Sequence, residues 1–327
     1  MHKPIHCLLA LCAQVCALTC ALPGAALAQA YPTKPVKLVI PFPPGAATDI
    51  LGRLLAQKLT EAWGQSVVVD NKAGAGGILG AEISAKSPAD GYTIFMGHIG
   101  THGANPALFS KLPYDPVKDF APVSLLVTIP NLVAVHPALP VNSMRELIDL
   151  AKSRPGTLNV ASPGVGTSAH LNIALFKSLT GTELTHVPFK GSVAAMQAIV
   201  GGEVQAAFDT VTSIMPQARA GKLRVLAVSS KERSPLVPDA PPLNDAVPGF
   251  DVSTWFAFFV PVGTPRAVID RIHGDTVRAL QSKDTAERLQ GFGMNIVGGS
   301  PEQLAAHVAS EIARWGKVVK EANIRIE

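Results

Sequence analysis

The chain has 327 residues, of which 47% are hydrophobic and 16% are charged, and its formal net charge at pH 7 is +4. The hydrophobic fraction excludes a disordered or low-complexity chain. The small, scattered positive charge lacks the clustered basic face typical of a nucleic-acid binder, so no nucleic-acid partner is expected. At about 100–200 residues per domain, the length predicts two domains with sizeable cores.

The first 28 residues have the pattern of a secretory signal peptide. His2 and Lys3 give a basic start, an apolar run covers 5–22, and Ala26-Leu27-Ala28 supplies the small residues of a cleavage site. A transmembrane anchor is the alternative, but the apolar run is barely long enough to span a bilayer. We therefore expect cleavage after Ala28 and a periplasmic location.

All four cysteines lie in this leader, at Cys7, Cys12, Cys16 and Cys20. The chain after the predicted cleavage has none, which excludes disulfides, thiolate metal sites and cysteine nucleophiles there. No later segment reaches the roughly 18 uninterrupted apolar residues of a membrane span.

Beyond the leader, short β-branched runs alternate with segments of helical periodicity. Strands are predicted at 36–40, 67–69, 92–96, 123–127, 132–135, 158–161, 183–187, 205–208 and 223–228. Helices are predicted at 49–63 and 81–86, after Ser143 with Glu146 at the capping-box position, and after Thr264-Pro265 and Ser300-Pro301 towards 280 and 323. This alternation predicts an α/β fold with parallel or mixed sheets flanked by helices.

The Pro/Gly-rich segment 234–250 predicts a loop that returns the chain between two domains. If the C-terminal helices pack on the first domain, that domain is discontinuous. The expected organisation is a signal peptide at 1–28, lobe 1 at 31–128 and 254–327, and lobe 2 at 129–253.

Residues 43–49, Pro-Pro-Gly-Ala-Ala-Thr-Asp, form a first turn that leads from a strand into a helix. A helix N-terminus with free N–H groups attracts anions, and Gly45 lets a ligand approach the backbone closely. The alternative is a plain capped helix in which Thr48 or Asp49 satisfies the first N–H groups and Asp49 pairs with Arg53. This turn alone favours the plain helix.

Residues 162–169, Ser-Pro-Gly-Val-Gly-Thr-Ser-Ala, form a second turn. It contains G-x-G-x-x-A, with Glu183 near the position of a dinucleotide-site acid, but a single match of this kind is weak. Nicotinamide cofactors are also scarce outside the cytoplasm. The hydroxyls of Ser162, Thr167 and Ser168 suit a carboxylate or phosphate equally well, so we interpret this turn as an anion cradle. A third turn at 71–77 lacks the Gly-Lys-Ser/Thr of a P-loop and is interpreted as a plain turn before a helix.

Motifs of enzymes and metal sites are largely absent from the sequence. There is no Gly-x-Ser-x-Gly nucleophile elbow, and His98 and His102 have H-x-x-x-H spacing without the intervening Glu of a zinc site. His170 suits a structural capping role. Asp209 follows a strand, where open α/β sheets bind ligands, although a helix cap would suit it equally. We expect no cofactor, no metal and no enzymatic activity.

The chain after the leader resembles the Bug-type (TctC-like) periplasmic substrate-binding proteins of tripartite tricarboxylate transporters. The matching motifs, in order, are 31–32, 44–49, 71–77, 90–93, 112–115, 162–170, 187–191, 201–202, 208–209, 255–256 and 261–265. The resemblance implies a two-lobed, type II-like binding protein with a ligand cleft between the lobes. It also implies a small carboxylate ligand and delivery to the membrane subunits of the transporter; we expect a monomer.

In that family, the first turn and the Ser-x-Gly-x-Gly-Thr turn hold the carboxylates, partly through water. The resemblance therefore implies a set of ligand-binding residues: Pro44, Gly45, Ala46, Asp49, Ser162, Gly164, Gly166, Thr167, Ser168 and Asp209. Ala46 departs from the family, which usually has a second glycine there, and its methyl group narrows the approach to the backbone.

The ligand stays open among mono-, di- and tricarboxylates, acidic amino acids, aromatic acids and nicotinate-like molecules. Two alternative functions also remain: an exported α/β hydrolase, and a periplasmic sensor partner that presents its ligand to a membrane receptor.

Overall fold

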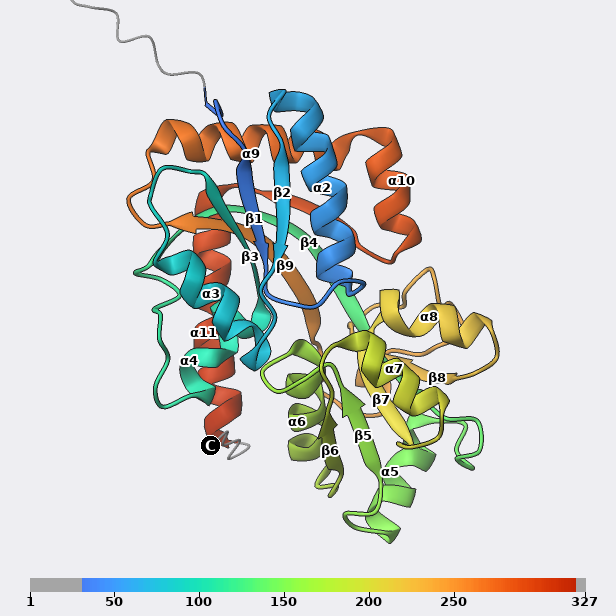
Figure 1. Ribbon diagram of the computed structural model, residues 1–327. Helices are drawn as coiled ribbons and strands as arrows, with labels where there is room; N and C mark the ends of the chain where they lie inside the picture. Colours follow the sequence, from blue (N-terminus) through green and yellow to red (C-terminus); the bar gives the residue numbers. More distant parts are fainter. Residues whose placement is uncertain (1–30, 322–327) are drawn as a thin grey trace, which may run out of the picture. The chain divides into compact units, whose positions relative to one another are not determined.

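The computed structural model describes residues 31–321 (Figure 1), so the predicted signal peptide lies outside the described residues. The folded unit begins at Lys34. Across 31–321, none of the helices combines the length and the apolar character needed to cross a membrane.

The folded unit is built on a mixed ten-stranded sheet. Eight strands follow the order β2-β1-β3-β9-β4-β7-β5-β6, and β8 and β10 both pair with β4. The strands are β1 (Val36–Ile40), β2 (Val67–Asn71), β3 (Thr93–His98), β4 (Phe120–Val135), β5 (Asn159–Ser162), β6 (Thr185–Pro188), β7 (Ala206–Thr210), β8 (Arg224–Val228), β9 (Ser253–Pro261) and β10 (Asn295–Gly299). The pairs of β1 with β2 and β3, and of β5 with β6 and β7, are parallel, whereas every pairing of β4 is antiparallel.

Helices flank this sheet. They are α2 (Ala47–Trp63), α3 (Ile78–Ala85), α4 (Asn105–Leu108), α5 (Met144–Ser153), α6 (Ser168–Thr180), α7 (Ser192–Val200), α8 (Val211–Arg219), α9 (Arg266–Gln281), α10 (Lys283–Gly291) and α11 (Pro301–Glu321). Short helical turns lie at Ala75–Gly77, Gly100–Ala104 and Leu243–Asp245.

Strand β4 runs through both halves of the sheet. Its residues 120–130 pair with β9, and its residues 131–135 pair with β7 and β8. We call β1–β3, β9, β10 and their helices the first lobe, and β5–β8 with α5–α8 the second lobe (Figure 1). This continuity makes one sheet where the sequence pattern suggests two.

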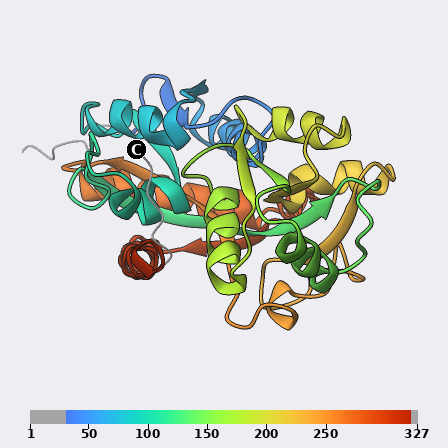
Figure 2. The same cartoon turned by 90° about the horizontal axis from the view of Figure 1, so that it is seen from below.

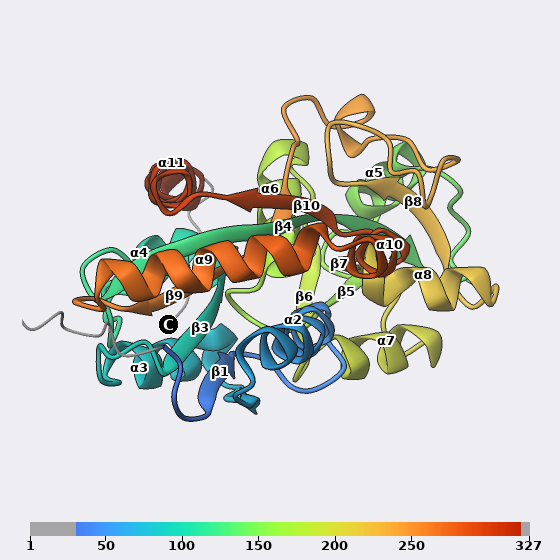
Figure 3. The same cartoon turned by 90° about the horizontal axis from the view of Figure 1, so that it is seen from above.

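Both long C-terminal helices lie on the first lobe. Helix α9 contacts α2, β4 and β10, and α11 contacts β4 and α4. Seen from above, α9 runs along β4 while α11 is end-on, and the view from below also shows α11 end-on (Figures 2 and 3). The chain therefore returns from the second lobe to complete the first.

The structure confirms several local predictions and corrects others. Ser143 caps α5 by accepting the N–H of Glu146 at 3.2 Å, and Ser300 caps α11 in the same way. Thr264 does not cap α9, because its hydroxyl donates to the carbonyl of Pro261 and the helix begins at Arg266. The strands predicted at 123–127 and 132–135 are one strand, β4.

Candidate functional site

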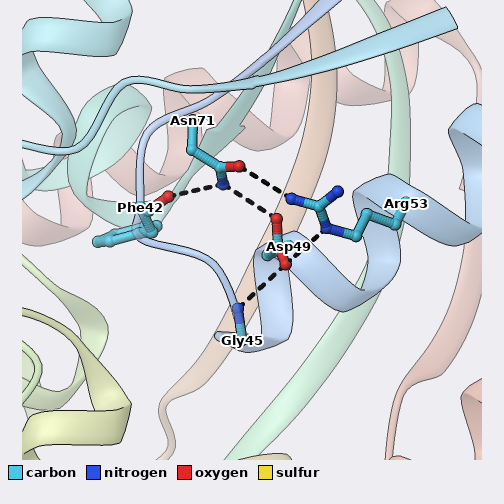
Figure 4. A network of polar contacts seen from close by, with 5 residues as sticks. All are labelled: Phe42, Gly45, Asp49, Arg53 and Asn71. Atoms are coloured by element: carbon cyan, nitrogen blue, oxygen red, sulfur yellow. Dashed lines mark hydrogen bonds and ion pairs between the residues drawn. The ribbon is translucent and has the colours of Figure 1, made fainter.

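The first turn is held by a buried carboxylate. Asp49 Oδ2 accepts the N–H of Gly45 at 3.0 Å and Arg53 Nε at 2.9 Å, and Oδ1 accepts Asn71 Nδ2 at 3.0 Å (Figure 4). Asn71 Nδ2 also donates to the carbonyl of Phe42. Burial raises the pKa of Asp49, but these hydrogen bonds outweigh it and leave the pKa below its ordinary value. Both carboxylate oxygens of Asp49 therefore hold the turn in place through hydrogen bonds.

The start of α2 lies beside this network, and its residues Ala46, Ala47 and Thr48 line a small cavity. Ala46 is the N-cap residue and offers no side-chain cap to the helix. Since the first N–H groups of a helix have no acceptor within it, the backbone of Ala47 and Thr48 can serve a ligand. Pro44 and Gly45 are exposed, and Gly45 has a φ of +87°, which favours glycine.

The second turn is shaped largely by its own side chains. Thr167 Oγ1 donates to the carbonyl of Gly164 at 2.6 Å and accepts the N–H of His170 at 3.4 Å, so it caps α6. Ser162 Oγ accepts the N–H of Gly164 at 3.1 Å. The Nδ1 atom of His170 accepts the N–H of Gly166 at 3.3 Å, consistent with the structural role expected for this histidine.

Ser168 connects this turn to the central strands. Thr254 Oγ1 on β9 donates to Ser168 Oγ at 2.6 Å, and Asn131 Nδ2 on β4 donates to Thr254 Oγ1 at 3.1 Å. All three side chains are buried. The sequence did not single out Asn131 or Thr254 as part of the site.

Asp209 lies at the end of β7 with one oxygen unsatisfied. Its Oδ1 accepts the N–H of Thr210 at 2.7 Å, whereas its buried Oδ2 has no hydrogen-bond partner within 31–321. Burial raises the pKa of Asp209 to about 6, against the opposing effect of the Thr210 N–H and of the nearby hydroxyls of Thr210, Ser192 and Ser213.

A small cavity brings these features together. Four of the residues implied by the resemblance line it: Ala46, Thr167, Ser168 and Asp209. The other lining residues are Phe42, Ala47, Thr48, His98, Pro163, Gly191, Ser192, Thr210, Thr254 and Phe256. The cavity therefore has walls from both lobes, and this lining, within the described part of the chain, holds no lysine or arginine. Its volume of about 40 Å³ is a few times the roughly 10–15 Å³ that a cavity needs in order to hold one water molecule.

The other implied residues lie outside this lining. Asp49, Ser162 and Gly166 belong to the hydrogen-bonded frames of the two turns. Gly45 lines a neighbouring groove beside α7 and α8, and Gly164 lines another groove with the 73–77 loop.

The 71–77 turn, interpreted from the sequence as a plain turn, contacts the second lobe. A Cβ built on Gly76 would overlap the carbonyl oxygen of Val165, and one on Gly100 would overlap that of Gly166. These two glycines therefore allow the backbones of the two lobes to approach closely.

The structure contains a serine–histidine contact that bears on the hydrolase alternative. Ser162 Oγ lies 2.6 Å from His186 Nε2, but Ser162 is fully buried. Burial, followed by the positive charges of neighbouring groups, lowers the pKa of His186 to about 3. A general base works best with a pKa near the operating pH, so this imidazole is poorly suited to activate the serine.

The two histidines with H-x-x-x-H spacing are fully buried, and each makes its own contacts with other residues. His98 Nδ1 accepts the N–H of Gly100 at 3.0 Å, and the His102 ring stacks on Phe259 with centroids 3.7 Å apart. Burial lowers the pKa of both. Among residues 31–321, no group of three or more His, Cys, Asp or Glu side chains is placed to hold a metal ion.

The model of one protein family matches most of this chain. Residues 51–324 match the model of the tripartite tricarboxylate transporter family receptor. The chain is 39% identical over 295 residues to a UPF0065 protein of a Pseudomonas species, covering 90% of this chain and 88% of the relative. It is 36% identical to the protein BugT of Bordetella pertussis over 302 residues, covering 92% and 93%.

Solved structures are also similar. A Rhodopseudomonas palustris protein determined with adipate has a TM-score of 0.87 and 39% identity, covering 90% of this chain and all of that one. MatC from the same species, with bound malate, has a TM-score of 0.85 and 37% identity over 88% of this chain and all of that one. The chain belongs to the tripartite tricarboxylate transporter receptor (TctC/Bug) family of solute-binding proteins.

Proposed function

We propose that this protein captures a small dicarboxylate between its two lobes, in the periplasm, and delivers it to the membrane subunits of a tripartite transporter. The observation that carries the proposal is the cavity lined jointly by the starts of α2 and α6. Helix N-termini stabilise anions through free N–H groups and the helix dipole. A site of this kind binds a carboxylate without a cationic side chain.

The choice of a dicarboxylate is supported by the relatives. Two solved proteins with 37–39% identity were determined with adipate and malate. Two helix starts, one from each lobe, also offer one N–H cluster for each end of such a ligand.

The small volume of the cavity supports a binding site that opens and closes by movement of the two lobes. A volume of about 40 Å³ is well below the roughly 300–1,000 Å³ of typical ligand pockets, which favours separation of the lobes before a ligand binds. Strand β4 changes its pairing partners between Pro130 and Asn131, which makes this point the natural hinge. We propose lobes at 31–128 with 254–327 and at 129–253, which place the hinge near their boundary.

A thermal-shift screen followed by calorimetry tests the function. Adipate, malate, citrate, aspartate and benzoate are compared with dimethyl adipate, which keeps the chain of adipate but removes both charges. A ligand at a hundredfold excess over Kd stabilises the folded state by about 2.7 kcal/mol, and we expect this with at least one diacid and not with the ester. Stabilisation by the ester alone would contradict carboxylate recognition, and turnover of p-nitrophenyl acetate that is lost in Ser162→Ala would favour the hydrolase.

A further inference from the structure

The carboxyl group of Asp209 poses an electrostatic problem for the proposed function. The proposal places an anionic ligand in a cavity whose lining includes Asp209 but, among the described residues, no lysine or arginine. Two carboxylates that share a site without a cation raise each other's pKa strongly. A proton on one of the two carboxyl groups would relieve this repulsion.

The hydrogen bonds of Asp209 indicate which oxygen would take that proton. Oδ1 accepts the main-chain N–H of Thr210 at 2.7 Å and is therefore fixed as an acceptor. Oδ2 is buried, and no hydrogen-bond partner for it is present in 31–321. A proton on Oδ2 would make it a hydrogen-bond donor in the wall of the cavity that Asp209 lines.

The surrounding elements bring no charge that would keep Asp209 ionised. Strands β4 and β5 and helix α7, which pack against β7, have no titratable side chain. Helix α6 carries His170 and Lys177, α8 carries Arg219, and His98 lines the same cavity from β3. The influences on the Asp209 carboxyl are burial and hydrogen bonds, with no charged group among them. Burial also lowers the pKa of His98 to about 3, so this ring is neutral at pH 7.

We propose that Asp209 is protonated in the ligand-bound state and donates its Oδ2 proton to a carboxylate oxygen of the ligand, so that capture of the dicarboxylate takes up one proton. This inference rests on the proposed function and adds to it a specificity-determining group. The raised pKa of the free protein, about 6, agrees with it, because an anionic ligand raises that pKa further. Affinity is then highest below this pKa and falls as the pH rises above it.

The test is calorimetric titration with adipate between pH 6.5 and 8.5, a range in which both adipate carboxyls stay ionised because ordinary carboxyl pKa values lie near 4. The wild type should lose affinity by about tenfold per pH unit, since one proton is bound with each ligand. At pH 7.5, its heat of binding should differ between phosphate and Tris by the buffers' difference in ionisation enthalpy, multiplied by a proton uptake near one. This measurement needs no variant.

Asp209→Asn supplies the matched change, because its amide keeps an acceptor for Thr210 and always presents a donor. We expect its affinity to be independent of pH and to exceed that of the wild type at pH 8.5. Asp70→Asn on β2, at a partly exposed carboxylate paired with Lys72, should keep the wild-type pH dependence.

The outcomes separate the two proposals. A wild-type affinity that does not change with pH, with equal heats in both buffers, would overturn proton uptake while leaving carboxylate capture intact. Weak binding by a folded Asp209→Asn at every pH would overturn hydrogen-bond donation at this position, because the asparagine amide presents a donor at every pH. Absence of binding to adipate and the other acids by both proteins would overturn the proposed function itself.

Discussion

The substitution Gly76→Ala tests whether the lobes must meet as the structure shows. Gly76 has a φ of +62°, and a Cβ placed on it would overlap the carbonyl oxygen of Val165 while lying 3.2 Å from its carbonyl carbon. Those atoms belong to the backbone of the second turn and cannot rotate away. The added methyl group therefore opposes closure of the lobes.

The magnitude follows from a comparison with Gly64, which ends α2. Gly64 has a φ of +63°, and its Cβ would have no heavy atom within 4 Å. At either position, the left-handed conformation of alanine costs about 1–2 kcal/mol of folding free energy. Only Gly76→Ala adds the clash, and overpacking of this kind costs about 1–3 kcal/mol. If that cost falls on the closed state, affinity decreases roughly 5- to 150-fold.

The assay is calorimetric titration of both variants with the best acid from the screen, alongside thermal unfolding. We expect the two variants to unfold at similar temperatures, because an opened cleft relieves the clash, and Gly76→Ala to bind at least fivefold more weakly. If Gly76→Ala binds within twofold of Gly64→Ala, the contact between the turns does not contribute to ligand capture.

Three further predictions concern the turns and the metal requirement. Thr167→Val removes the cap of α6 and should cost about 1 kcal/mol of stability and weaken binding about tenfold or more, measured by unfolding and calorimetry; unchanged values of both would contradict its role. The lowered pKa of Asp49 means that the wild type should be more stable than Asp49→Asn by about 1 kcal/mol at neutral pH, as seen in urea titrations. This advantage is complete above the ordinary pKa of 3.8 and should disappear as the pH falls through the lowered value; an advantage that persists in acid would refute it. EDTA should leave ligand affinity unchanged, whereas loss of affinity that zinc or calcium restores would show a metal site.

Local patterns predicted the position of the two turns and the pair of Asp49 with Arg53, because these depend on nearby residues. The hydroxyls of Ser162 and Thr167, expected to serve an anion, form hydrogen bonds within the second turn. The i,i+4 pair of Asp49 and Arg53 and the hydroxyl–glycine spacing of 162–168 both determine hydrogen bonds within a few residues. Asp209 was placed correctly at the end of its strand for the same reason. Its unpartnered oxygen required the packed structure to be recognised.

Sequence patterns did not predict contacts between residues that lie far apart in the chain. Asn131 and Thr254 are 123 positions apart and join only because β4 and β9 are antiparallel neighbours, a pairing that periodicity does not encode. Strand β9 itself had a usable signal in its apolar run at 255–260. The prediction has two strands where the structure has β4, which continues through Pro130 although proline is normally confined to the edges and bulges of sheets.

The contact made by Gly76 illustrates the same limit. A glycine in a loop is compatible with a plain turn as well as with a close approach to another backbone. Only the position of Val165 in the second lobe distinguishes the two.

The most direct test of the account is a crystal structure of the protein with adipate at pH 6.5. We expect the ligand between the starts of α2 and α6, with one carboxylate oxygen within hydrogen-bond distance of Asp209 Oδ2 and the other end near the backbone of Ala47 and Thr48. A ligand bound instead in the groove beside the 73–77 loop, or outside both lobes, would contradict the proposed site.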